Sequence, residues 1–176
     1  MLDFGAGNGM VGEQLRGLGV KRLVGVDLLT AARDAAARDR PGVYDDYLAA
    51  DLTDLSRSQL ERLQQASFTA MAWVAALGFG DVPVRAFVQA YDLVSSPGLV
   101  AFNLRDRFFA EQDASGFGAL LTRMYDEGVL TELSREPYRH RLSVSGAELT
   151  YLCVVGRKNA DVPQEWVEQA TASSSG

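Results

Sequence analysis

Cysteine and histidine are almost absent from this sequence. Its 176 residues include one cysteine, Cys153, and one histidine, His140. A single cysteine cannot form an internal disulfide, and neither residue has the partners that a thiolate or multi-histidine metal site requires. No metal centre is therefore predicted, and Cys153 is interpreted as a core residue in a reducing compartment.

Long apolar runs and an excess of positive charge are missing as well. No apolar stretch reaches membrane-spanning length, and no charged start leads into an apolar segment with a cleavage site. Lysine and arginine total 17 against 23 aspartate and glutamate residues, a formal net charge of -6. Because clustered basic residues supply most nucleic-acid affinity, a nucleic-acid partner is disfavoured. We predict a cytoplasmic protein that does not enter a membrane, and the oligomeric state stays open.

The length and the 47% share of hydrophobic residues suit one compact core rather than two. We assign this single domain to residues 1–159. The remaining residues, 160–176, end in Ser-Ser-Ser-Gly and are predicted to be disordered.

Short apolar runs alternate with segments of helical spacing along most of the chain. Strands are expected at residues 1–4, 23–26, 47–50, 68–74, 99–104, 129–135 and 149–155. Helices are expected around residues 11–18, 30–40, 60–63, 87–94 and 117–124. Thr30 is expected to cap the second helix, and residues 137–146 to form a loop. This alternation predicts a parallel sheet covered on both faces, with the last two strands forming an antiparallel hairpin at one edge.

A glycine-rich turn follows the first strand directly. Glycines at positions 5, 7 and 9 allow a tight turn and leave backbone N–H groups at a helix start, where a carboxylate or phosphate can bind. Three acids stand near strand ends: Asp3 before the turn, Asp27 after the second strand and Asp51 after the third. Ligands of open parallel sheets bind beyond these ends, so Asp27 could accept hydrogen bonds from ribose hydroxyls and Asp51 from an adenine amino group. An adenosine-containing ligand is therefore predicted.

Several segments together resemble the class I S-adenosylmethionine-dependent methyltransferase family. They are Leu2-Asp3-Phe4-Gly5-Ala6-Gly7-Asn8-Gly9, Val24-Gly25-Val26-Asp27, Ala49-Ala50-Asp51-Leu52 and the turn into the fifth strand, Pro97-Gly98-Leu99-Val100-Ala101-Phe102. The resemblance implies a Rossmann-like α/β fold with a mostly parallel seven-stranded sheet, helices on both faces and an antiparallel C-terminal hairpin. It also implies S-adenosylmethionine as the cofactor and S-adenosylhomocysteine as its product.

The resemblance assigns a role to each motif. The turn from Gly5 to Gly9 would hold the methionine part of the cofactor, with Asp3 orienting the turn and the cofactor's ammonium group. Asp27 would bind the ribose hydroxyls, and Asp51 with the Leu52 backbone would bind the adenine. The predicted cofactor-binding residues are Asp3, Gly5, Ala6, Gly7, Asn8, Gly9, Asp27, Leu28, Asp51 and Leu52.

Two other functions stay open at this point. The run from Gly7 to Gly12 matches the G-x-G-x-x-G pattern of nicotinamide-dependent oxidoreductases, but this register would place Gly5 and Ala6 inside the preceding strand. The helix that precedes the first strand in the methyltransferase family, and often shapes its substrate lid, has no counterpart in this sequence. A module that binds the cofactor with an incomplete substrate site is therefore the second alternative.

The methyl acceptor is predicted from weaker signals. The segment 75–81 should lie beside the transferred methyl group and is mostly apolar, which favours a small, partly hydrophobic acceptor. It lacks the Asn/Asp-Pro-Pro-aromatic signature of the family's amino- and amide-nitrogen methylators. No spacing identifies a general base, so the catalytic residues are unassigned.

Several single residues are weighed as further candidates. Asn103 and Arg105 could contact a polar or anionic end of the acceptor, although a solvated loop is the simpler interpretation. His140, placed with Tyr138 in the 137–146 loop, could act as a base but is interpreted as a surface or packing residue. Trp73 and Phe79 are the aromatic residues nearest the predicted site, and both are interpreted as core residues.

Overall fold

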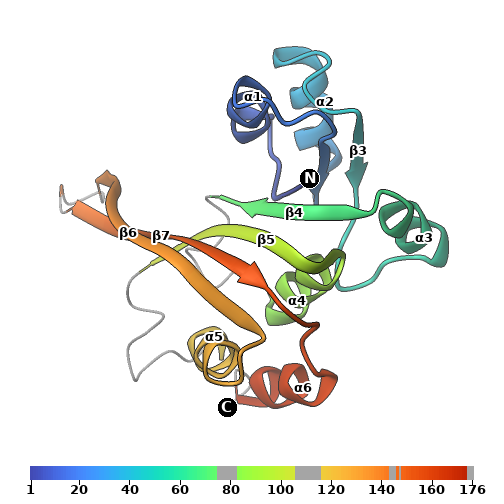
Figure 1. Ribbon diagram of the computed structural model, residues 1–176. Coiled ribbons are helices and arrows are strands. Elements are labelled where there is room, and N and C mark those ends of the chain that lie inside the picture. The colour runs from blue at the N-terminus through green and yellow to red at the C-terminus, as the bar shows by residue number, and fades with distance from the viewer. Residues whose placement is uncertain (75–82, 106–115, 143–145, 147, 174–176) are drawn as a thin grey trace.

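The computed structural model describes residues 1–74, 83–105, 116–142, 146 and 148–173. A seven-stranded sheet runs through the centre of this part of the chain in the order β3-β2-β1-β4-β5-β7-β6 (Figure 1). Its strands are β1 (Leu2–Phe4), β2 (Val24–Asp27), β3 (Asp46–Ala49), β4 (Phe68–Trp73), β5 (Val94–Arg105), β6 (Leu130–Leu142) and β7 (Glu148–Lys158). The helices are α1 (Met10–Gly17), α2 (Thr30–Asp39), α3 (Arg57–Gln65), α4 (Val84–Asp92), α5 (Phe117–Asp126) and α6 (Gln164–Ser173).

The first five strands pair in parallel, and β7 pairs antiparallel with both β5 and β6. Helices α1 and α2 lie on one side of the sheet and α4, α5 and α6 on the other (Figure 1). This confirms the predicted Rossmann-like class I methyltransferase fold with its antiparallel hairpin. None of the helices in the described ranges is both long and apolar enough to cross a membrane.

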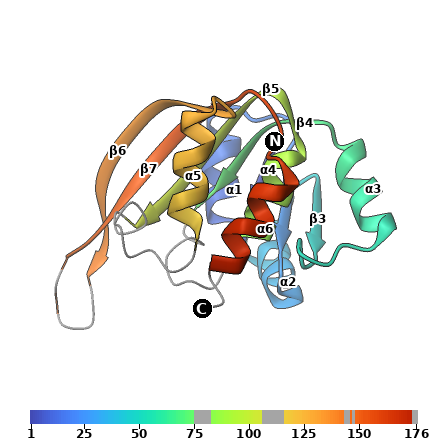
Figure 2. The same cartoon turned by 90° about the horizontal axis from the view of Figure 1, so that it is seen from below.

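The densest packing lies between the sheet and the helices α4 and α5, which Figure 2 shows from below. Phe87 of α4 is fully buried there, with its ring centroid 5.2 Å from Trp73 of β4 and 4.9 Å from Phe117 of α5. Such aromatic contacts add to the free energy gained from burying apolar area. They hold the end of β4 in place, and this end borders the site described below.

The C-terminal tail differs from its prediction. Residues 164–173 form α6, where disorder was expected. Four apolar side chains, of Val162, Trp166, Val167 and Ala170, are buried at helical spacing in this region, and the Arg123 guanidinium lies 4.2 Å from the Trp166 ring. The polar residues at the end of the chain led to the prediction of disorder, although these four apolar residues precede them. The helix is stabilised by packing on α4 and α5.

The predicted loop at residues 137–146 is largely strand. β6 continues to Leu142 because its backbone pairs with β7 along almost its whole length. Pro137 is tolerated because β6 is the edge strand of the sheet, where a missing N–H donor leaves no neighbour unpaired. His140 therefore belongs to β6, at the shift in register between Arg139 and Arg141, rather than to a loop.

Three smaller predictions are also wrong. Cys153 is exposed on β7 rather than buried in the core, because side chains alternate along a strand and its neighbour Val154 takes the buried side. Thr30 is the first residue of α2, whose N-cap is Leu29 and has no side-chain cap. β5 begins at Val94, before the Pro97-Gly98 turn, since Val94 pairs with Phe68 ahead of a register shift.

Candidate functional site

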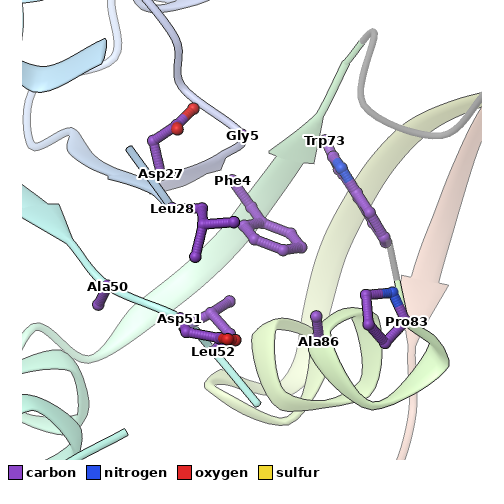
Figure 3. Close-up of a pocket in the computed structure, with 10 residues that line it drawn as sticks. All are labelled: Phe4, Gly5, Asp27, Leu28, Ala50, Asp51, Leu52, Trp73, Pro83 and Ala86. Atoms are coloured by element: carbon purple, nitrogen blue, oxygen red, sulfur yellow. The ribbon is translucent and has the colours of Figure 1, made fainter. Parts of the chain in front are cut away.

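A cavity of about 190 Å³ opens at the carboxyl ends of β1, β2, β3 and β4. The strand order reverses between β1 and β4, which is the position where open α/β sheets bind ligands. The lining residues, drawn in Figure 3, are Phe4, Gly5, Asp27, Leu28, Ala50, Asp51, Leu52, Trp73, Pro83 and Ala86.

The glycine turn is attached to the end of β2. The backbone N–H groups of Gly5 and Ala6 donate to the carbonyl of Val26 at 2.8 and 3.1 Å. The Asp27 carboxylate accepts one hydrogen bond from the Gly7 N–H at 2.9 Å and another from the Leu29 N–H at 3.0 Å. Asp27 thus fixes the turn while its side chain borders the cavity.

Positive backbone angles explain why the turn needs glycine. Gly7 and Gly9 have φ values of 52° and 87°, which residues with a Cβ rarely adopt. A Cβ on Gly9 would also lie 3.2 Å from the Val43 side chain. The turn can therefore pass closely over the segment that leads into β3.

That segment holds the other side of the turn. The Tyr47 hydroxyl donates to the Gly7 carbonyl at 2.8 Å, and the Arg40 guanidinium donates to the Asn8 carbonyl at 3.1 Å. The Tyr44 hydroxyl lies 3.4 Å from the Ala6 carbonyl. The carbonyls of Gly7 and Asn8 are therefore held by the side chains of Tyr47 and Arg40, which sequence reasoning did not single out.

Asp3 is buried beneath the turn, with 1% of its surface exposed. Its carboxylate accepts a hydrogen bond from the Tyr44 hydroxyl at 2.7 Å. Burial raises the pKa of Asp3 to about 6; the Tyr44 hydrogen bond lowers this pKa and the negative charge of Asp27 raises it. At neutral pH, Asp3 is thus a buried carboxylate whose ionisation opposes folding.

Replacing Asp3 with asparagine should therefore stabilise the protein at pH 7. Because its pKa is raised in the folded protein, ionisation of Asp3 lowers the free energy of unfolding. This loss is small below about pH 4, grows as the pH rises, and is complete above about pH 6. We expect Asp3→Asn to gain roughly 2 kcal/mol in urea unfolding at pH 7, and this gain should vanish near pH 4. The exposed Asp34→Asn variant is the control, and a gain of equal size at both pH values would contradict the assignment.

Gly12 is the third glycine of the G-x-G-x-x-G match, and the structure gives it a packing role. It lies buried on α1, and a Cβ there would come within 2.6 Å of the Tyr44 hydroxyl. Since Tyr44 is held by Asp3, the ring has little freedom to move away. The need for glycine at this position follows from the tyrosine, without reference to a dinucleotide.

Asp51 lines the same cavity as Asp27, and its side chain is exposed. Its carboxylate accepts hydrogen bonds from the Thr53 N–H at 2.8 Å and the Thr53 hydroxyl at 2.7 Å, and these lower its pKa. Asp27 and Asp51, at the ends of adjacent parallel strands, therefore face one cavity as carboxylates (Figure 3).

The sequence model of a methyltransferase domain matches residues 2–102, from β1 into β5. This match covers more than half of the chain. The chain belongs to the methyltransferase domain family, in its class I S-adenosylmethionine-dependent branch. S-adenosylmethionine is accordingly the cofactor of this methyltransferase. No curated protein sequence matches it.

Solved structures show the same fold in distant methyltransferases. An S-adenosylmethionine-dependent methyltransferase from Methanosarcina mazei is 14% identical, with a TM-score of 0.62, and the match covers 91% of this chain and 92% of that one. The N-methyltransferase NodS from Bradyrhizobium japonicum, solved with S-adenosylhomocysteine, is 19% identical with a TM-score of 0.63 over 90% and 77%. A putative RNA methyltransferase from Pyrococcus horikoshii is 15% identical with a TM-score of 0.64 over 90% and 74%. These likenesses show the fold of the methyltransferase.

Half of the ten predicted cofactor-binding residues line the cavity of this methyltransferase. They are Gly5, Asp27, Leu28, Asp51 and Leu52. The other five, which form or support the turn, do not line it, and they are Asp3, Ala6, Gly7, Asn8 and Gly9.

Sequence reasoning missed most of the apolar wall of the cavity. Pro83 and Ala86 come from the start of α4, and only the fold brings them to the ends of β1 and β3. Trp73, interpreted from sequence as core, is fully buried and also lines the cavity. Its indole N–H has no hydrogen-bond partner among the described residues.

The remaining candidates have different outcomes. Asn103 lies within β5, 2% exposed, and its side-chain amide donates to the Tyr138 hydroxyl of β6. The backbone of Arg105 pairs with Tyr151 in the same sheet. Phe79 and the rest of the 75–81 segment lie outside the described residues.

Proposed function

We propose that this methyltransferase transfers the methyl group of S-adenosylmethionine to a small molecule in the cytoplasm. The observation that carries the proposal is that Asp27 and Asp51 line one cavity beside the glycine turn. In this proposal Asp27 accepts hydrogen bonds from the ribose hydroxyls while keeping the turn in place. Asp51 and the Leu52 backbone bind the adenine edge, and Leu28 packs on the adenosine.

The turn would hold the methionine part of the cofactor. The side chains of Tyr47 and Arg40 already donate to the carbonyls of Gly7 and Asn8, which fixes these peptide planes of the turn before a ligand arrives. A preorganised turn binds without a further loss of backbone entropy. A buried N–H without an acceptor is costly, so a ligand atom that reaches the Trp73 indole would strengthen binding.

The chemistry requires positioning more than it requires a dedicated base. The acceptor's lone pair attacks the methyl carbon in line with the breaking carbon–sulfur bond, whose electron pair stays on the sulfur of S-adenosylhomocysteine. A pocket that excludes water and places the nucleophile about 3 to 3.5 Å from the methyl carbon supplies much of the acceleration. The small-molecule acceptor is supported by the net charge of -6, which disfavours nucleic acid.

Calorimetric titration with S-adenosylhomocysteine, alongside NADH, tests this proposal. We expect micromolar binding of S-adenosylhomocysteine and none of NADH. The reason is that two carboxylates border the adenosine cavity and hydrogen bonds from Tyr47 and Arg40 hold the glycine turn. Tryptophan fluorescence of a Trp166→Phe variant offers a second readout, since it leaves Trp73, in the cavity wall, as the one tryptophan. Binding of NADH alone would refute the proposal. Binding of S-adenosylhomocysteine without transfer to any acceptor would favour the cofactor-binding module.

A further inference from the structure

A second cavity, of about 360 Å³, lies on the other side of the end of β4. Its lining includes Val74, while the preceding residue, Trp73, lines the cofactor cavity. Two sites that exchange a methyl group must adjoin, because the reacting atoms have to approach to about 3 to 3.5 Å. Consecutive residues at the end of β4 border the two cavities, Trp73 the cofactor cavity and Val74 the second one.

The floor of this second cavity is a row of residues across three strands. Asn103 of β5 pairs with Cys153 of β7, which pairs with Glu136 of β6. Their side chains line the cavity, together with that of Tyr138 two residues further along β6. Phe102 packs against Phe87 of α4, so Asn103, the next residue of β5, lies on the opposite face of the sheet. None of the described helices covers β5, β6 and β7 on that face (Figure 1), and Cys153 is exposed there.

The polar groups of the cavity are few and converge at one place. Asn103 is 2% exposed, and its amide donates to the Tyr138 hydroxyl, so both side chains are held in fixed positions. Burial raises the pKa of Tyr138, which keeps its hydroxyl protonated at neutral pH. Among the described residues that line the cavity, Glu136 is the one with a charged side chain. Apolar walls with a small number of fixed polar groups are typical of sites for small, largely apolar ligands.

Given the proposed function, we propose that this second cavity binds the methyl acceptor, and that the acceptor is a small aromatic phenol or amine. The ring of the acceptor lies against Val74 and Tyr138. The acceptor's oxygen or nitrogen points toward the end of β4. In the reaction this atom forms a bond to the methyl carbon, the carbon–sulfur bond breaks, and the acceptor's proton passes to solvent. The Glu136 carboxylate disfavours acceptors with phosphate or carboxylate groups through like-charge repulsion.

Cys153 makes the proposal directly testable, because it is the single cysteine of the chain, is exposed and lines the cavity. The rate of its reaction with N-ethylmaleimide is measured with phenol, aniline or benzoate present, with and without S-adenosylhomocysteine. We expect phenol and aniline to slow the reaction in a saturable manner, and benzoate to have little effect. Equal rates in all cases would overturn the site, and equal protection by benzoate would overturn the acceptor class.

A cavity-filling variant provides the functional arm. Cys153→Trp places a large side chain in the second cavity, and strands accept tryptophan well. The matched control is Arg157→Trp, which is exposed on the same face of β7 but lies outside the lining. We expect methyl transfer to a panel of phenols and aryl amines to fall by about tenfold or more in Cys153→Trp alone, with unchanged affinity for S-adenosylhomocysteine.

The two proposals fail in different ways. If wild-type protein does not bind S-adenosylhomocysteine, the proposed function fails, whereas protection of Cys153 in the absence of cofactor still reports on the second cavity. If S-adenosylhomocysteine binds and Cys153→Trp methylates the panel as well as the control does, the acceptor site is refuted while the proposed function stands.

Discussion

Replacing Asp27 with alanine is expected to weaken the binding of S-adenosylhomocysteine by about 10- to 100-fold, on the order of 1.5 to 3 kcal/mol. Two effects combine in this loss. The variant removes the carboxylate that we propose accepts both ribose hydroxyls, and it also removes the acceptor of the Gly7 and Leu29 N–H groups. Calorimetric titration of both proteins measures the difference.

A ligand analogue separates the direct contact from the effect on the turn. With 2′-deoxy-S-adenosylhomocysteine, the wild-type protein should lose affinity while Asp27→Ala should lose little more, because the partner of that hydroxyl is already gone. Asp34→Ala, on the exposed face of α2, is the control for a lost surface charge and should bind normally. Unchanged affinity in Asp27→Ala would refute the ribose assignment.

Replacing Lys158 with alanine is expected to destabilise the protein by roughly 2 to 3 kcal/mol, because a buried hydrogen-bond acceptor and a partly buried carboxylate lose their partner. The Lys158 side chain is fully buried, and its ammonium group lies 2.5 Å from the Asp161 carboxylate and 4.0 Å from that of Asp92. It also donates to the Tyr91 carbonyl at 2.9 Å. The variant leaves that carbonyl and the half-buried Asp92 without their cation.

The loss should be concentrated at the C-terminal helix. Asp92 also accepts a hydrogen bond from the Val162 N–H at 3.1 Å, so the cluster around Lys158 ties the start of the α6 region to α4. Urea unfolding gives the total loss, and hydrogen exchange shows whether α6 opens first. Arg139→Ala, which breaks the exposed pair with Glu148, is the matched control and should cost less than about 1 kcal/mol. A similar small loss in Lys158→Ala would contradict the role assigned to it.

The sequence predicted the parts of the cofactor site that depend on local order along the chain. Gly5 to Gly9 directly follow β1, Asp27 is the last residue of β2 and Asp51 lies two residues beyond β3. The carboxyl ends of parallel strands meet at one edge of a sheet. Once the alternation of strands and helices is read correctly, these residues must approach one another. Their place at one end of the sheet therefore required no knowledge of side-chain packing.

Other parts were decided by the tertiary structure, because their partners are distant in sequence. Tyr44 and Tyr47 hold residues about 40 positions earlier, and no local pattern marks a tyrosine for such a contact. The order of α6 depends on the packing of Trp166 and on the buried Lys158, not on its own polar sequence.

The second cavity shows the same division. Asn103, Cys153 and Glu136 come from three separate strands, and only the antiparallel register of β5, β7 and β6 places them in one row. The chain by itself therefore determined the fold and the family, since both follow from the order of short local motifs. The walls of both cavities were decided by tertiary structure, because register and helix packing depend on the free energy of the whole fold.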